Sequence, residues 1–338
     1  MKLRTLAIGA VAAALAAGVC AFAALTLSPW PRALLIRHDY DRNGETLGAA
    51  LDARAPTDVT ALRDLSYGAS ADETLDLYLP AGASRERAPP LVVWIHGGGW
   101  LSGDKSHVAG YLKMISARGY AVAGVNYSLS PGAIYPTPVR QSFEALAFLA
   151  REASRLHVDA TRIVLAGDSA GAQTAAQMAE AIADRDYAKA SGVTPTIPRT
   201  DLRGALLFCG LYDAALLKLD GPGSGIRRTY MWAYAGTKDF LDAPAFAPFS
   251  VARYVTANFP PAFVTAGNAD PLGGQSLAFA AALGSKGVPV DRLFYAQDHA
   301  PPLDHEYQFD LSLSDSVQAL ARAVAFLDRV TDVKGASP

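Results

Sequence analysis

Short apolar runs alternate with longer amphipathic stretches along most of the chain. Segments 91–95 and 121–125 are continuously apolar, a pattern typical of strands buried on both faces of a sheet. The stretches between the runs carry apolar residues at helical spacing. This alternation predicts an α/β fold whose mostly parallel sheet has helices on both faces. The expected parallel strands are 91–95, 121–125, 162–166, 205–208, 262–266 and 290–295, and the expected helices are 106–118, 138–156, 169–183, 275–286 and 314–330. Segments 59–67 and 74–79 are expected to add an antiparallel edge pair.

Two regions interrupt the alternation. Segment 184–200 is polar and contains two prolines, so it is expected to be a surface loop. Segment 213–258 begins without a clear helix or strand pattern and then carries a group of aromatic residues. We interpret it as an insertion within the domain. Its aromatic side chains would either form a lid or pocket wall, or pack a small core of their own.

The N-terminus carries a separate signal. Lys2 and Arg4 precede an uncharged run from residue 5 to residue 31, with an Ala-rich apolar centre at 6–27. A membrane anchor needs about 20 apolar residues, and a secretory signal needs a shorter run with a small-x-small cleavage site. Ala21-Phe22-Ala23 fits such a site, so both interpretations remain open. We therefore expect residues 1–31 to be a signal or anchor associated with the membrane through 5–27. Residues 32–338 are expected to form the folded domain, outside the cytoplasm.

Composition excludes several classes of protein. Of the 338 residues, 51% are hydrophobic and 18% are charged, which is inconsistent with a disordered chain. The net charge of −2 provides no basic field for nucleic acid. The two cysteines, Cys20 and Cys209, exclude a disulfide framework and a cysteine-rich metal site.

Gly167-Asp168-Ser169-Ala170-Gly171 matches the G-x-S-x-G pattern between an expected strand and an expected helix. A serine on such a turn exposes its Oγ above the sheet, and the following helix directs N–H groups toward developing negative charge. His96-Gly97-Gly98-Gly99-Trp100 follows the strand at 91–95, and its glycine run is typical of an oxyanion loop. The expected oxyanion donors are the N–H groups of Gly97, Gly98 and Ala170. His96 precedes Ser169 and is expected to be structural.

These two motifs resemble those of the α/β-hydrolase superfamily, specifically the hormone-sensitive-lipase-like and BD-FAE-like esterases. The resemblance extends from about residue 59 to 330. It includes the segment 126–131 and the Asp270-Pro271-Leu272 motif. Three positions depart from the pattern: Ser128 replaces a frequent Arg, Gln141 a frequent Asp, and Glu306 the glycine that usually follows the histidine. The departures leave the expected chemistry intact and bear on the substrate.

The fold that this resemblance implies orders its triad as Ser, then Asp or Glu, then His. Asp270 follows the strand at 262–266, and its rival Asp213 follows the preceding strand. His305 begins a His-x-aromatic pattern, whereas its rival His299 does not. We therefore predict a catalytic triad of Ser169, Asp270 and His305, with Cys209 a buried hydrophobe.

The predicted activity is hydrolysis of small-molecule carboxylic esters through an acyl-enzyme, without metal or organic cofactor. An amide-cleaving relative, such as an arylformamidase or peptidase, would use the same machinery. A non-catalytic, membrane-tethered binding protein is the third interpretation. The presence of all three triad candidates argues against it.

Overall fold

The computed structural model describes residues 15–20 and 22–332. Within this part of the chain, one 8-stranded sheet has the order β1-β2-β4-β3-β5-β6-β7-β8. The pair β1–β2 and the pair β2–β4 are antiparallel, and the remaining pairs are parallel. The strands are β1 (Thr60–Ser66), β2 (Thr74–Leu79), β3 (Pro90–Ile95), β4 (Ala121–Val125), β5 (Asp159–Asp168), β6 (Leu202–Phe208), β7 (Ala262–Thr265) and β8 (Val290–Leu293). All eight expected strands are confirmed, including the antiparallel edge pair.

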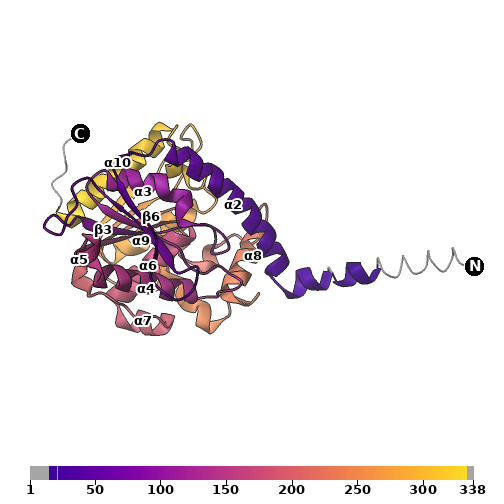
Figure 1. The fold of residues 1–338 in the computed structure, drawn as a ribbon. Helices are drawn as coiled ribbons and strands as arrows, with labels where there is room; N and C mark the ends of the chain where they lie inside the picture. The colour runs from indigo at the N-terminus through magenta and orange to yellow at the C-terminus, as the bar shows by residue number, and fades with distance from the viewer. Residues whose placement is uncertain (1–14, 21, 333–338) are drawn as a thin grey trace, which may run out of the picture.

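Helices cover both faces of the sheet, as the α/β pattern predicted (Figure 1). Val93 of β3 packs into one core cluster with side chains of α4, α6 and α9. Its neighbours Val92 and Trp94 pack into a second cluster with side chains of α3 and α10. Because successive side chains of a strand point to opposite faces, a strand covered on both sides has to be apolar throughout. These helices are α3 (Ala109–Ser116), α4 (Thr137–Arg151), α6 (Ala170–Ala183), α9 (Gly273–Ser285) and α10 (Ser314–Thr331), with the short α5 (Ala153–Leu156) after α4.

The long helix α2 (Trp30–Asp52) was not predicted. It buries few side chains, and its apolar residues form no continuous face. Two glycines instead allow close packing: a Cβ at Gly44 would lie 2.3 Å from His107 Nδ1, and one at Gly48 would lie 3.3 Å from the same residue's backbone. The helix crosses one end of the body, where α8 (Ser224–Ala235) lies beside it (Figure 1). Close packing through glycine leaves no hydrophobic periodicity for sequence inspection to detect.

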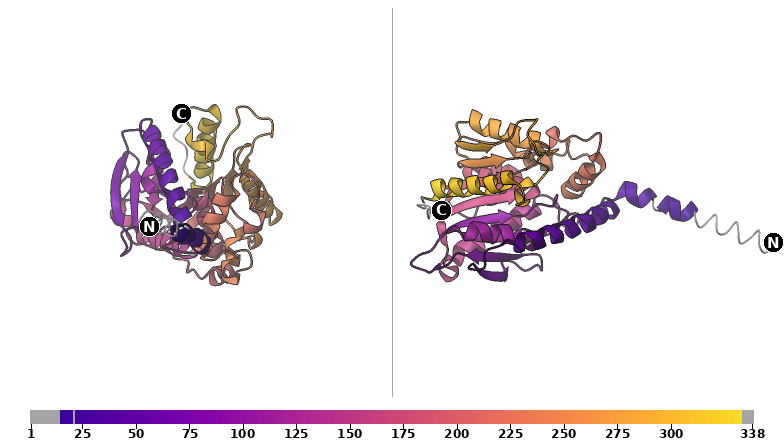
Figure 2. Two further views of the ribbon diagram at one scale, coloured as in Figure 1. Left: turned by 90° about the vertical axis from the view of Figure 1, so that its right-hand side faces the viewer. Right: turned by 90° about the horizontal axis from the view of Figure 1, so that it is seen from above.

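Before α2, a helix at Leu15–Leu27 projects away from the body (Figure 2). Among the described helices, none alone has the length and hydropathy of a membrane span. The helix Leu15–Leu27 and α2 meet both criteria only as a pair, bent by 76°. Lys2, Arg4 and Ala21 of the N-terminal prediction lie outside the described residues.

The two interrupting regions contain more regular structure than expected. The predicted loop at 184–200 contains α7 (Arg185–Ser191), which Asp184 caps through the backbone N–H of Asp186. The aromatic insertion contains α8 and short 3-10 helices. Most of its aromatic rings pack a core: Tyr234 stacks on Trp100 with ring centroids 4.4 Å apart. Tyr230 of α8 instead lines the pocket described below. The insertion therefore serves both of the purposes considered for it.

Candidate active site

Ser169 lies on a sharp turn between β5 and α6, with φ 50° and ψ −116°. Few residues other than glycine adopt a positive φ, so the surrounding structure has to enforce it. Close packing supplies that constraint: a Cβ at Gly171 would lie 1.9 Å from the carbonyl oxygen of Ile95. The glycines of the motif thus allow the turn to press against β3, and the serine Oγ faces a pocket.

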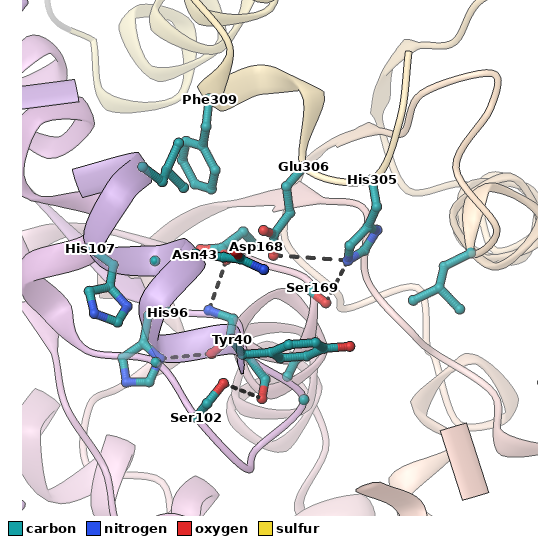
Figure 3. A pocket seen from close by; sticks show the side chains of 18 of the residues that line it. Tyr40, Asn43, His96, Ser102, His107, Asp168, Ser169, His305, Glu306 and Phe309 are labelled. Atoms are coloured by element: carbon teal, nitrogen blue, oxygen red, sulfur yellow. Dashed lines mark hydrogen bonds and ion pairs between the residues drawn. The ribbon is translucent and has the colours of Figure 1, made fainter. Parts of the chain in front are cut away.

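The structure brings together the three predicted triad residues from three separate loops. Nε2 of His305 lies 2.9 Å from Ser169 Oγ (Figure 3). Nδ1 of His305 lies 3.0 Å from both carboxylate oxygens of Asp270. Asp270 follows β7, its side chain is fully buried, and the backbone N–H of Leu272 donates to it. The imidazole is therefore held with one nitrogen on a buried carboxylate and the other on the serine hydroxyl.

Electrostatics favour a strongly basic His305. Burial lowers the pKa of the imidazole, but its neighbours Cys209 and Asp270 outweigh that effect and raise the pKa well above the ordinary value. Burial raises the pKa of the Cys209 thiol to about 11, so the thiol is neutral near pH 7. We therefore attribute the rise at His305 to Asp270, whose carboxylate stabilises the imidazolium.

The rival residues have other partners. Asp213 accepts hydrogen bonds from Arg253 and from the backbone N–H of Ala215, both at 2.9 Å. His299 lies 3.1 Å from Asp315. Both are therefore engaged away from Ser169.

His96 is structural, as expected. Its ring stacks on Tyr127 with centroids 4.4 Å apart, and its Nδ1 lies 2.8 Å from the carbonyl oxygen of Gly97. Burial lowers its pKa to about 4, so it stays neutral. Its role is to hold the start of the glycine loop in place.

The prediction of Gly97 as an oxyanion donor is wrong. Its N–H donates to Asp168 Oδ2 at 2.8 Å, so it is not available to a substrate. In the described part of the chain, the N–H groups of Gly98 and Gly99 have no hydrogen-bond acceptor. Ala170 is the first residue of α6, where an N–H lacks a partner within the helix. The available donors are therefore Gly98, Gly99 and Ala170. The sequence prediction missed Gly99, although the run of three consecutive glycines already offered its N–H group as a candidate.

A pocket of about 770 Å³ opens beside Ser169. Its walls include the glycine loop, the His305 loop and residues of two helices, α2 and α8. Tyr40 and Asn43 of α2 lie over the site in Figure 3. Sequence inspection could not identify these α2 residues, because the helix itself was not predicted.

Two of the residues that depart from the family pattern, Ser128 and Gln141, are hydrogen-bonded to each other. Gln141 accepts a hydrogen bond from the Ser128 N–H at 2.8 Å and donates to the Ser128 Oγ at 2.9 Å. The third departure, Glu306, has a left-handed backbone conformation, φ 61°, and its Oε1 lies 3.9 Å from His305 Nε2. A carboxylate therefore occupies the position beside the base where the pattern has only hydrogen.

Cys209, Asp270 and His305 offer donor atoms within 4.8 Å of one another, as a metal site would. However, His305 is already hydrogen-bonded to Asp270 through one ring nitrogen and to Ser169 through the other. Nothing beyond proximity connects Cys209 to a metal, so we assign the group to the triad.

Comparison with known proteins identifies the family and the fold. The model of the BD-FAE family matches residues 75–283. Esterase LipI of Mycobacterium tuberculosis is 28% identical over 219 residues, covering 64% of this chain and 66% of LipI. An acetyl esterase of Salmonella schwarzengrund is 29% identical over 230 residues, covering 65% of each. The chain thus spans just under two thirds of these relatives.

Among solved structures, esterase B from Lactobacillus Rhamnosis superimposes with a TM-score of 0.76 at 23% identity, covering 89% of this chain and 96% of that one. This similarity establishes an α/β-hydrolase fold. The family match spans β2 to α9 and includes Ser169 and Asp270. The chain therefore belongs to the BD-FAE family.

Proposed function

We propose that this protein is a serine hydrolase that cleaves small-molecule carboxylic esters through an acyl-enzyme. The observation that carries the proposal is the chain of contacts Ser169 Oγ to His305 Nε2 at 2.9 Å and His305 Nδ1 to Asp270 at 3.0 Å. The esterases among its relatives support the same reaction.

The geometry implies a sequence of proton transfers. His305 takes the hydroxyl proton as Ser169 attacks the ester carbonyl, and Asp270 holds the imidazole and stabilises its charge. The N–H groups of Gly98, Gly99 and Ala170 stabilise the oxyanion. His305 then passes its proton to the leaving alcohol. In the second half of the cycle it activates water, which releases the acid and regenerates Ser169.

The test compares p-nitrophenyl acetate, butyrate and laurate as substrates of the wild type and of Ser169→Ala. Turnover that falls by several orders of magnitude in the variant supports the proposal, and the chain-length profile defines the acyl pocket. A fluorophosphonate that labels Ser169 in a protein inactive on all three esters would favour amide cleavage. A folded protein that neither labels nor turns over would be a binding protein.

We also propose that the N-terminal segment attaches the protein to a membrane on its extracytoplasmic side. Its described helix is apolar and exposed: Leu15, Val19 and Phe22 are 67%, 67% and 70% accessible. Such side chains favour a lipid environment over water. Fractionation of cells that express the full chain, with and without carbonate washing, tests this attachment. Recovery in the soluble fraction as a chain cut after Ala23 would identify a cleaved signal instead.

A further inference from the structure

Glu306 places a carboxylate in the pocket, beside the catalytic base. Its side chain is 29% exposed, and its Oε1 lies 3.9 Å from His305 Nε2. Among the described residues, no backbone N–H, amide, hydroxyl or guanidinium group donates a hydrogen bond to it. In Figure 3 the carboxylate lies beside Asp168 and faces the His305 imidazole. Its polar neighbours are the His305 imidazole and the Asp168 carboxyl group. The lone pairs that these two groups leave free can accept a cationic group of a ligand.

The rest of the pocket is acidic as well. The lining carboxylates besides Glu306 are Asp104, Asp168, Asp304 and Asp310. Arg227 also lines the pocket, but its guanidinium donates to the backbone carbonyls of Lys218 and Pro222 at 2.5 and 2.8 Å. A concave site with one dominant sign of charge concentrates ligands of the opposite sign.

Glu306 and Asp168 reinforce each other. A Cβ at Gly97 would lie 2.3 Å from Asp168 Oδ2 and 2.8 Å from Glu306 Oε1, so the two carboxyl groups are close neighbours. Burial, together with the Glu306 carboxylate, raises the pKa of Asp168 well above its ordinary value. Asp168 therefore retains its proton more readily than an ordinary aspartate, and a cation bound beside the pair would stabilise the ionised carboxylates.

The position of Glu306 also indicates which part of an ester it would contact. His305 Nε2 has to reach the leaving oxygen to protonate it, so the alcohol portion of the substrate lies beside Nε2. Glu306 lies beside the same nitrogen. Tyr40 and Tyr230 line this pocket too, and aromatic rings attract cations.

We propose that the pocket prefers esters whose leaving alcohol carries a cationic group, as choline does, and that Glu306 binds the cation. This substrate class rests on the proposed hydrolase function for its turnover. The binding step does not depend on turnover, because the charge complementarity is present before any bond is broken.

The test measures binding to the full-length Ser169→Ala protein, which removes the nucleophile. Butyrylcholine and its uncharged analogue 3,3-dimethylbutyl butyrate have nearly the same shape and differ in charge. We expect the cation to bind at least about tenfold more tightly by calorimetry, with a preference that weakens as salt increases. Adding Glu306→Gln should reduce the ratio of the two Kd values about tenfold.

Two further variants complete the design. Glu306→Gly suits the left-handed backbone and gives a second, unstrained way to remove the carboxylate. Asp298→Asn removes one negative charge from an exposed position of the same loop and should leave the ratio unchanged. Equal affinities for the two esters, or a ratio that survives both Glu306 variants, would overturn the proposal. Failure of p-nitrophenyl ester hydrolysis would instead count against the hydrolase function alone.

Discussion

The backbone N–H of Gly97 donates to the Asp168 carboxylate at 2.8 Å and thereby ties the glycine loop to the turn that carries Ser169. The other carboxylate oxygen of Asp168 accepts from Trp94 Nε1 at 2.7 Å. Asp168 thus connects β3, the glycine loop and the nucleophile turn. This contact sets the distance between the nucleophile and the donors that would receive the oxyanion.

Asp168→Ala should therefore impair both stability and rate. Removing the acceptor leaves two buried N–H groups unpaired, at about 1–3 kcal/mol each. We expect a lower Tm and a kcat that falls at least tenfold, because the glycine loop is no longer held against Ser169. Thermal denaturation and p-nitrophenyl butyrate kinetics measure the two effects. A variant with wild-type kcat would show that the hydrogen bond between Gly97 and Asp168 has no influence on the oxyanion donors.

Gly98→Ala should damage activity through its immediate surroundings. Gly98 has φ +101°, and a Cβ there would lie 2.2 Å from the carbonyl oxygen of Ser102. The loop would have to shift, and loss of an oxyanion donor costs about 10²–10³ in kcat. Gly119→Ala is the matched control, because Gly119 has φ +102° with open space around it. Equal losses of activity in the two variants would assign the effect to backbone strain alone.

Most of the fold could be predicted because its core strands are buried on both faces. Segments such as Leu91 to Ile95 have no polar position, and the two glycine motifs sit at strand ends, where topology places functional groups. The triad followed from chain order. The helix α2 could not be predicted, because Gly44 and Gly48 pack by close approach rather than through an apolar face. The short α7 was hidden in a polar segment.

The oxyanion donors show a different limit of prediction from sequence. Three consecutive glycines offer three N–H groups, and nothing in the amino-acid sequence indicates which one donates to Asp168. That assignment depends on the pairing of β3 with β5, which places Ile95 opposite Gly167 and so positions Gly97 beside Asp168. A local motif therefore predicted the loop, and only tertiary structure could assign its individual groups.

The pH dependence of activity should reflect the raised pKa of His305. The imidazole has to be neutral to act as a base, so a higher pKa moves the acid limb of kcat/KM to higher pH. We expect its midpoint above about 6.5, the ordinary histidine value. Asp270→Asn should move the midpoint down and reduce kcat by several orders of magnitude. A midpoint that stays in place in Asp270→Asn would exclude Asp270 as the cause of the shift.

The helix α2 should be required for a stable domain, whereas the helix before it should not. Arg37 donates to the carbonyl oxygens of Leu101 and Ser130 at 2.5 and 2.7 Å, and Asp41 accepts from the Gly103 N–H at 3.2 Å. A chain that starts at residue 28 keeps these bonds and should retain wild-type activity on p-nitrophenyl butyrate. A chain that starts at residue 53 loses them, at about 1 kcal/mol each. We expect its free energy of unfolding to fall by about 3 kcal/mol or more in urea titration. Equal stability of the two chains would show that α2 is only a spacer.

Glu180 should make the protein less stable as the pH rises. Its side chain is fully buried in α6, and burial raises its pKa to about 7 from an ordinary 4.5. Between these two values the folded state holds a proton that the unfolded state has released, so stability declines as pH increases through this window. Glu180→Gln should remove the decline and be more stable than the wild type above pH 7. The control is Glu152→Gln, which removes a partly exposed carboxylate beside Arg155 and should not show this pH dependence. Urea denaturation from pH 5 to pH 8 measures the difference, and parallel curves for wild type and Glu180→Gln would mean that Glu180 ionises normally.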